Sequence, residues 1–382
     1  MATPSGLGEV ARVFLWLGTI GFGGPVAHIA LMEQEVVQRR RWVAADEFLD
    51  LLGLTNLIPG PNSTEMAMAL GFRRAGWRGL LVGGAAFIAP AALITCALAW
   101  VYVRYGTTPQ VAPWLWALAP SVVGLMAGAI FRLARTAITR PAQAGIAAAV
   151  AVLGFAGIDE VVLLLAAGGV GVVGLWWRPA AMAGLFLAMC PAVVFGAPYL
   201  APPAAQPPLW AIWLFFLKTG AVLYGGGYVL VALLQPLVDT YGWLSQAQLV
   251  DAVAAGQVTP GPVLTTATFV GYLLHGMPGA AAATIAIFLP AFLFVALLGH
   301  LAPRLRRWAP ARGFLGGVNA AAVALMFVVT VTLVRSVVTS PAAIIVASAG
   351  TIAAIAGING GWIVLTGLVA GGLIRLLGTC CF

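Results

Sequence analysis

"PGPNSTEMA" at residues 59–67 and "PGPVLTTAT" at residues 260–268 set the same tripeptide into two apolar regions of the chain. Proline donates no backbone hydrogen bond and disfavours helix in the residue before it, and glycine permits the reversal between two prolines. Each stretch therefore predicts that one half-helix ends and another begins. Within a membrane, the freed backbone groups must be satisfied by protein or by a ligand.

The composition indicates a membrane protein. Hydrophobic residues make up 62% of the 382 residues and charged residues 8%, with a mean hydropathy of +1.02, whereas a soluble domain carries about 25% charged residues. The apolar runs are long and continuous, as at residues 85–103, and lack the alternation of β-barrel strands. We therefore predict an all-α polytopic fold in a lipid bilayer.

The remaining composition argues against several classes of site and partner. The net charge of +8 comes from clustered arginines, which in a membrane protein report topology, so no nucleic-acid partner is predicted. Four cysteines form no CxxC pair and three histidines are scattered, so we predict no zinc site, no disulfide framework and no cofactor. The first 30 residues lack the features of a signal peptide, so Met1 is expected to begin the mature protein.

An internal duplication organises the chain, because residues of the first half recur in order 200 to 202 positions later. The pairs are Phe22-Gly23-Gly24-Pro25 with Tyr224-Gly225-Gly226-Gly227, Trp42 with Trp243, Asp50 with Asp251, Pro59-Gly60-Pro61 with Pro260-Gly261-Pro262, and Gly71, Gly76, Gly79 and Pro90 with Gly271, Gly276, Gly279 and Pro290. We predict an N-terminal transmembrane repeat over 1–200, a Pro-rich linker over 201–208 and a C-terminal transmembrane repeat over 209–382.

Each repeat is expected to follow one order of helices. The predicted segments are a helix with the glycine motif (7–32 and 209–234), a helix–Pro-Gly-Pro–helix unit (45–72 and 246–273), two full spans (76–104 and 113–135; 278–301 and 312–335), and further spans, two or three in 142–199 and two in 341–378. The arginines at 39–41, 73, 74, 78, 132, 135 and 140 share a cytoplasmic side if the Pro-Gly-Pro unit is re-entrant. Residues 235–243 carry no Lys or Arg, so the second repeat is predicted to be inverted, as in many secondary transporters.

The two broken helices are interpreted as the halves of one anion site. A half-helix N-terminus presents free N–H groups and the positive end of a dipole, and Asn62, Ser63 and Thr64 offer N-cap chemistry. The alternative is a simple loop between spans, which one copy of the tripeptide would favour. The candidate substrate-binding residues are Asn56, Pro59, Gly60, Pro61, Asn62, Ser63, Thr64, Gln257, Thr259, Pro260, Gly261, Pro262, Thr265 and Thr266.

Glycine motifs and isolated charges add further candidates. Gly23 and Gly24, with Gly225, Gly226 and Gly227, mark either an unwound helix beside the site or close helix packing. Lys218, the only lysine, is expected near mid-bilayer depth, as an anion ligand or as the partner of an acid. Glu65 is a possible coupling group, a partner of Lys218 or a first-turn acid stabilised by the dipole. His28 is either a coupling group or a packing residue.

These motifs carry a resemblance to a known family. The stretches at 22–43, 58–79, 218–238 and 257–280 resemble the chromate ion transporter family, in its long two-domain type. The resemblance implies an inner-membrane exporter of chromate, with sulfate as the look-alike dianion and a homodimer as a possible assembly. The chain departs from the family pattern at Glu65, where a neutral polar residue is expected, and at Tyr224, where Phe is expected.

Three other functions are weighed against chromate export. The first is transport of sulfate or another oxyanion, which the sequence does not separate from chromate. The second is an intramembrane enzyme, against which no HExxH, GxSxG or acid–histidine pair is present. The third is a structural membrane subunit, against which the duplicated broken helices argue. No GxxxxGK[ST] motif for ATP is present, and an inside-negative potential of 100 mV favours outward movement of a dianion by roughly 4.6 kcal/mol.

Overall fold

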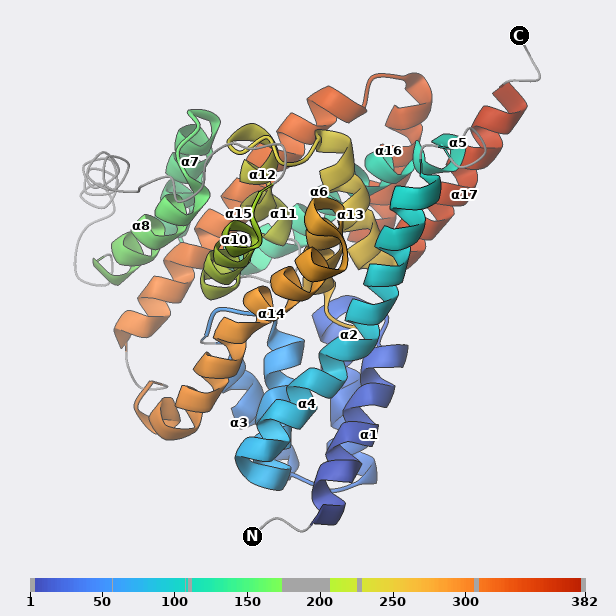
Figure 1. The fold of residues 1–382 in the computed structure, drawn as a ribbon. Helices are drawn as coiled ribbons and strands as arrows, with labels where there is room; N and C mark the ends of the chain where they lie inside the picture. The colour runs from blue at the N-terminus through green and yellow to red at the C-terminus, as the bar shows by residue number, and fades with distance from the viewer. Residues whose placement is uncertain are drawn as a thin grey trace.

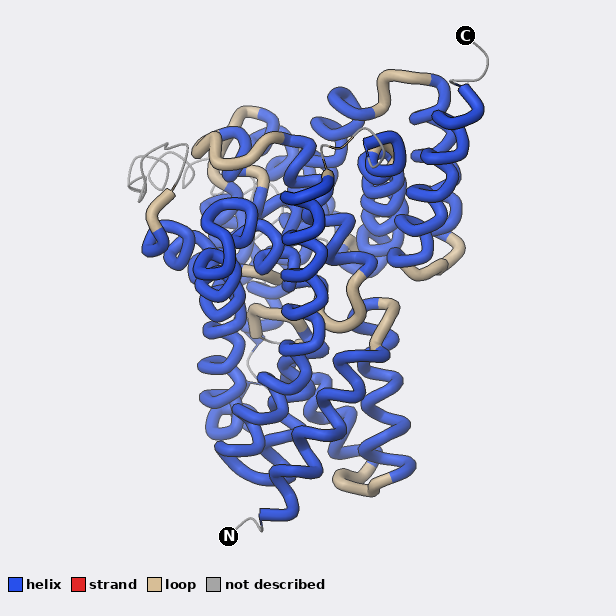
Figure 2. The backbone as a smooth tube through the Cα atoms, turned by 45° about the vertical axis from the view of Figure 1, so that its right-hand side comes forward, coloured by secondary structure: helices blue, strands red, loops and turns tan. Residues whose placement is uncertain are grey.

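The computed structural model describes residues 4–56, 58–106, 108, 112–173, 207–224, 229–305 and 309–378, and these residues form helices joined by short loops, without a strand among them (Figures 1 and 2). The predicted all-α fold is therefore confirmed. The Pro-rich linker lies almost wholly outside the described residues, as do Gly225, Gly226 and Gly227.

The helices of the two halves correspond at the predicted spacing. The first half contains α1 (Pro4–Ile20), α2 (Gly24–Met32), the π-helix η1 (Glu33–Arg39), α3 (Ala45–Thr55), α4 (Asn62–Tyr105), α5 (Ala112–Leu115), α6 (Leu118–Ala137), α7 (Pro141–Phe155) and α8 (Glu160–Val173). The second half contains α10 (Leu209–Val222), α11 (Val229–Leu234), α12 (Pro236–Asp239), α13 (Gln246–Val258), η2 (Val263–Thr265), α14 (Thr266–Leu305), α15 (Ala309–Val337), α16 (Pro341–Ile355) and α17 (Gly360–Gly378). Helix α13 starts 201 positions after the start of α3, and helix α16 starts 200 positions after the start of α7.

The glycine motif of the first half interrupts a helix, as one of the two interpretations expected. The predicted helix over 7–32 is two helices, α1 and α2, because Gly23 and Gly24 take left-handed φ angles of 115° and 74°. Close backbone packing occurs outside the motif, at Gly18, where a Cβ would lie 2.5 Å from the Phe87 backbone oxygen, whereas a Cβ on Gly24 would meet nothing within 4 Å. The motif in the first half therefore matches the interpretation of an interrupted helix.

The long helices α4 and α14 each contain a sharp reversal. Non-helical angles occur at Ala75 and Gly76 in α4 and at His275 and Gly276 in α14. On either side of the first reversal, a Cβ on Gly71 would collide with the backbone oxygen of Gly79, so the two parts of α4 lie antiparallel. The part from Asn62 to Arg74 spans only about 18 Å at 1.5 Å per residue, which is short of a bilayer core.

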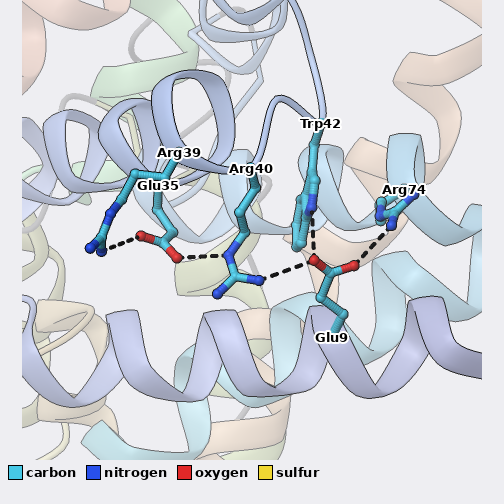
Figure 3. Close-up of polar contacts among 6 residues, drawn as sticks. All are labelled: Glu9, Glu35, Arg39, Arg40, Trp42 and Arg74. Atoms are coloured by element: carbon cyan, nitrogen blue, oxygen red, sulfur yellow. Dashed lines mark hydrogen bonds and ion pairs between the residues drawn. The ribbon is translucent and has the colours of Figure 1, made fainter.

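Ion pairs close the end of the re-entrant unit in the first half. Arg73 of α4 pairs with Glu47 of α3, so α3 enters and the first part of α4 returns at the same end. Figure 3 shows the neighbouring network of Glu9, Glu35, Arg39, Arg40, Trp42 and Arg74, in which Glu9 accepts bonds from Arg40, Arg74 and Trp42 at 2.8–3.3 Å. The predicted gathering of arginines 39–40 and 73–74 on one side is confirmed.

Glu35 is the best-enclosed carboxylate of this network. It lies 2.7 Å from Arg40 Nε and 3.1 Å from Arg39 Nη1. Burial alone would raise its pKa, but the hydrogen bonds from Arg40 and Arg39 outweigh burial and hold the pKa below its ordinary value. The network thus fixes η1 to α1 at the charged end of the molecule.

Packing crosses between the halves. Helix α6 of the first half packs on α16 of the second, α15 of the second packs on α7 and α8 of the first, and α4 packs on α14. In Figure 1, α1, α2 and α3 lie in the lower part of the view, below α6, α13 and α15. Four described segments are long and apolar enough to cross a membrane: Asn62–Tyr105, Leu118–Ala137, Val263–Leu297 and Gly313–Val337. The protein is a multi-pass membrane protein.

Candidate functional site

Each Pro-Gly-Pro segment is anchored on the helices of the other half. The Gly60 N–H donates to the Leu223 carbonyl at 2.8 Å, and the Gly261 N–H donates to the Gly21 carbonyl at 2.7 Å. These two bonds are equivalent under the repeat, because both acceptors lie directly before the glycine-rich motifs. These reciprocal hydrogen bonds place the Pro-Gly-Pro segment of each half against the residue that precedes the glycine-rich motif of the other half.

The long helices contact the tripeptides in the same reciprocal way. A Cβ on Gly60 would lie 3.3 Å from the Ala291 methyl of α14, and a Cβ on Gly261 would lie 2.9 Å from the Ala91 methyl of α4. Both glycines have positive φ angles, 145° and 92°, so glycine is required for backbone conformation as well as for space. Phe292, next to Ala291, packs on Gly84, about 10 Å along α4 from Ala91. The two tripeptides therefore flank the α4–α14 contact.

The predicted start of the first half-helix is confirmed, but its predicted capping is wrong. Helix α4 begins at Asn62, and the cap position is Pro61, in extended conformation and without a side-chain hydrogen bond. The Thr64 and Glu65 N–H groups both donate to the Pro61 carbonyl, and the Asn62 amide donates to Asn56 instead. Asn56 and Asn62 are thus brought together, and the proline carbonyl takes the place of a capping side chain.

Three threonine hydroxyls gather at the second Pro-Gly-Pro segment. Thr95 of α4, with a fully buried side chain, places its hydroxyl oxygen 3.1 Å from that of Thr265 and 3.3 Å from that of Thr259, and its single proton can be donated to either. Thr259 and Thr265 in turn donate to the carbonyls of Ala255 and Pro262. Each hydroxyl rotates freely and can turn its proton toward an anion. Thr266, also buried, donates to the Val263 carbonyl.

Two further helix starts meet this segment. The start of α17 touches Gln257, because a Cβ on Gly360 would lie 2.9 Å from Gln257 Oε1. Asn359 caps α17 through the Gly361 N–H and lies against Gly23, the residue before α2. Helices α2, α14 and α17 therefore begin around Gly261, and the N-terminus of a helix attracts an anion.

The first Pro-Gly-Pro segment is chemically different. Thr64 and Glu65 are fully buried, and neither the Thr64 hydroxyl nor either Glu65 carboxylate oxygen has a hydrogen-bond partner. The residue that corresponds to Thr95 is Val295, which has no hydroxyl to offer Thr64. Ser63 is buried beside them. The two halves of the predicted site are therefore not equivalent.

Lys218 pairs with an acid, as one of its two interpretations proposed. Its Nζ lies 3.4 Å from Asp159 Oδ2, with 44% and 40% of the two side chains exposed. Asp159 also accepts the N–H groups of Val161 and Val162, so it caps α8. The pair joins α10 to α8, and the predicted alternative of a Lys218–Glu65 pair is not formed.

His28 of α2 is a packing residue with one strong hydrogen bond in this conformation. Its Nε2 lies 2.8 Å from the Gly21 carbonyl, and its ring meets Phe87 edge-on. Nδ1 is buried without a partner. Since Gly21 also accepts the Gly261 bond, His28 lies one residue contact away from the second tripeptide. Its predicted coupling role stays a prediction.

Two residues of this site were absent from the sequence prediction. Thr95 is a single hydroxyl in an apolar run, and the only signal for it is the mismatch with Val295 in the repeat. Asn359 precedes a glycine pair at the position that Asp159 occupies in the first half. Comparing mismatched pairs between repeats, in addition to matched pairs, would have found both.

In the comparison with known families, the chromate transporter family matches two segments of the chain, residues 8–172 and 210–373, one in each half. The chain belongs to the chromate transporter family. The suspected resemblance is thereby confirmed, and the matched segments cover both halves.

Curated relatives support this assignment. The chromate transport protein of Cupriavidus metallidurans is 33% identical over 89% of this chain and 86% of its own length. The probable chromate transport protein of Synechococcus elongatus is 31% identical over 76% and 75%, and the chromate transport protein of Pseudomonas aeruginosa is 29% identical over 87% and 82%. These relatives are named as transport proteins, so the protein is a transporter and not an enzyme. No solved structure matches the chain.

Proposed function

We propose that the protein exports chromate across the inner membrane, driven by the membrane potential or by exchange for another ion. The observation that carries the proposal is the arrangement around Gly261, where three helix starts and the hydroxyls of Thr95, Thr259 and Thr265 surround one broken helix. Hydroxyl and backbone N–H donors suit a tetrahedral dianion.

The anion is proposed to bind at the second Pro-Gly-Pro segment. The repeat places Glu65, Asp159 and Glu160 in the first half where the second half has Thr266, Asn359 and Gly360. Carboxylates repel a dianion strongly in a medium of low dielectric constant, so the segment that lacks a carboxylate at these three positions is the better host. Gln257 and the backbone around Gly23 are further polar groups at this place. Lys218 belongs to the same half but pairs with Asp159 of the first half, so it would act on the anion from a distance.

Alternating access is proposed to arise from the exchanged contacts. Helices α3 and α13 each pack on the long helix that follows them, α4 and α14, but α13 also packs on α6 and α17, whereas α3 also packs on η1. Two equivalent units in different surroundings provide two arrangements that a transporter with inverted repeats can interchange. The arginine-rich end shown in Figure 3 is placed in the cytoplasm by the positive-inside rule. A homodimer would be compatible with this scheme but is not needed for it.

Sulfate transport is the second candidate, because the same donors accept any tetrahedral dianion. Labelled chromate flux into proteoliposomes under an imposed potential, with sulfate as competitor, tests both candidates. Chromate flux that follows the sign of the potential and resists excess sulfate is the expected result. Sulfate flux without chromate flux would move the function to the second candidate, and the absence of both would refute oxyanion transport at this site.

A further inference from the structure

Glu65 is a buried carboxylate without any stabilising partner in the described structure. Its residue exposure is 0%, and both side-chain oxygens lack a hydrogen bond. It lies in the first turn of α4 and its Oε1 points at Gly60 of the tripeptide. An isolated ionised carboxylate is too costly to hold in such a place, and a group in this situation neutralises instead. The described conformation therefore suits the protonated acid.

The surroundings of Glu65 contain no compensating cation among the described side chains. Tyr224, two residues after the end of α10, is the ionisable residue whose titration senses a charge on Glu65, and a Cβ on Gly60 would meet both Glu65 Oε1 and the Ala291 methyl of α14. Among the residues whose side chains are described, the other titratable residues on elements that pack against α4 are Glu9 and Arg12 on α1, His28 on α2, Asp46, Glu47 and Asp50 on α3, Asp251 on α13, and Tyr272 and His275 on α14. Glu9 and Glu47 pair with arginines at the charged end.

We propose that Glu65 binds one proton together with each anion that the protein carries, so that the cycle moves one net negative charge. This inference rests on the proposed transport of a dianion. An ionised Glu65 repels a dianion bound within the same membrane-embedded assembly, and a neutral Glu65 does not. Proton binding and anion binding therefore favour each other, and this coupling is reciprocal.

The second half shows which residue can replace Glu65 at the equivalent helix start. Thr266 occupies the position of Glu65 in the second half and donates to the Val263 carbonyl. A threonine there shows that the helix start folds without an acid. The Glu65→Gln and Glu65→Thr variants are therefore the two substitutions to make, the first as an analogue of the protonated acid and the second as the residue of the other half.

The experiment measures the potential at which net chromate flux vanishes in proteoliposomes at pH 8. For a tenfold chromate gradient, one net charge per chromate gives about 59 mV and two charges give about 30 mV. The wild type is expected near 59 mV, with a further shift of about 59 mV for a tenfold proton gradient. Glu65→Gln and Glu65→Thr are expected near 30 mV, without a response to the proton gradient. Asp46→Asn, on the exposed start of α3, is the control that should match the wild type.

Each outcome decides the proposal. A wild type near 30 mV that ignores the proton gradient overturns it while chromate transport stands. A variant that keeps the wild-type value and proton response also overturns it, because the proton then binds elsewhere. If neither variant folds, uptake of protons on adding chromate to purified wild type decides: one proton per anion supports the proposal, and none overturns it. A wild type without chromate flux removes the proposed function together with this inference.

Discussion

Replacing Thr95 with valine tests whether the hydroxyl cluster binds the anion. Thr95 is fully buried on α4 and can donate its one hydroxyl proton to Thr259 or to Thr265. Valine keeps the shape of the side chain and removes its hydroxyl. Both partner threonines retain their own bonds to backbone carbonyls, so Thr95→Val leaves no donor unpaired and should reduce stability by only about 0.5–1.5 kcal/mol.

The effect on transport should be larger than the effect on stability. A hydrogen bond to a charged group contributes about 1.5–3 kcal/mol, and 1.4 kcal/mol corresponds to a tenfold change. We therefore expect the kcat/KM for chromate to fall roughly 10- to 100-fold. The assay is initial chromate flux into proteoliposomes over a range of chromate concentrations, with thermal unfolding in detergent measured on the same preparation.

The equivalent position in the other half provides the matched control. Val295, also buried, is replaced by threonine, which adds a hydroxyl near the first Pro-Gly-Pro segment. Chromate flux should stay within about twofold of the wild type, because the anion is placed at the other segment. A Thr95→Val variant with unchanged kcat/KM would refute the assignment of the site, and so would equal losses in both variants.

Two further substitutions test the framework that holds the site. Gly261→Ala should lower the unfolding temperature and abolish transport, because a φ of 92° costs a non-glycine residue about 1–2 kcal/mol and the new methyl would meet Ala91. The control is Gly53→Ala, in open space on α3, which should be neutral or slightly stabilising. Equal effects of the two substitutions would contradict this explanation. Glu35→Gln should lower stability at pH 7 by about 1–2 kcal/mol. Because the pKa of Glu35 lies below the ordinary 4.5, its contribution to the free energy of unfolding is complete above about pH 5 and is lost as the pH falls through the lowered pKa. The stabilities of variant and wild type, measured by unfolding from pH 7 to pH 3, should therefore converge at low pH. A difference that stays constant with pH would argue against the ion pairs.

Sequence patterns predicted the local structure of the repeat closely. Pro-Gly-Pro placed the breaks between α3, which ends at Thr55, and α4, which begins at Asn62, and between α13, which ends at Val258, and η2, which begins at Val263, because the backbone limits of proline and glycine act over only a few residues. The glycine motif predicted the break after Ile20 as one of two alternatives. The arginine positions agreed with a re-entrant path of the first unit, which the prediction had taken as a condition.

The sequence did not predict which distant residues these local elements contact. Gly60 bonds to Leu223 and Gly261 to Gly21, across more than 160 positions, and no short-range pattern reports which half supplies the acceptor. Lys218 was predicted as an anion ligand or as the partner of an acid, and the sequence did not name Asp159 as that acid, because the choice depends on how α10 is rotated against α8. Thr95 was missed since one hydroxyl in an apolar helix does not alter its periodicity.

The antiparallel parts of α4 and α14 touch through glycine, and this has an evolutionary consequence. At Gly71 and Gly79, as at Gly271 and Gly279, any side chain would strike the opposing backbone. A collision between two side chains can be relieved by a second substitution to a smaller residue, but no substitution makes a backbone oxygen smaller. These four positions therefore have no route of compensating change. The two halves can differ in chemistry elsewhere, as they do at Glu65 and Thr266, while the four glycines keep the duplication recognisable in the sequence.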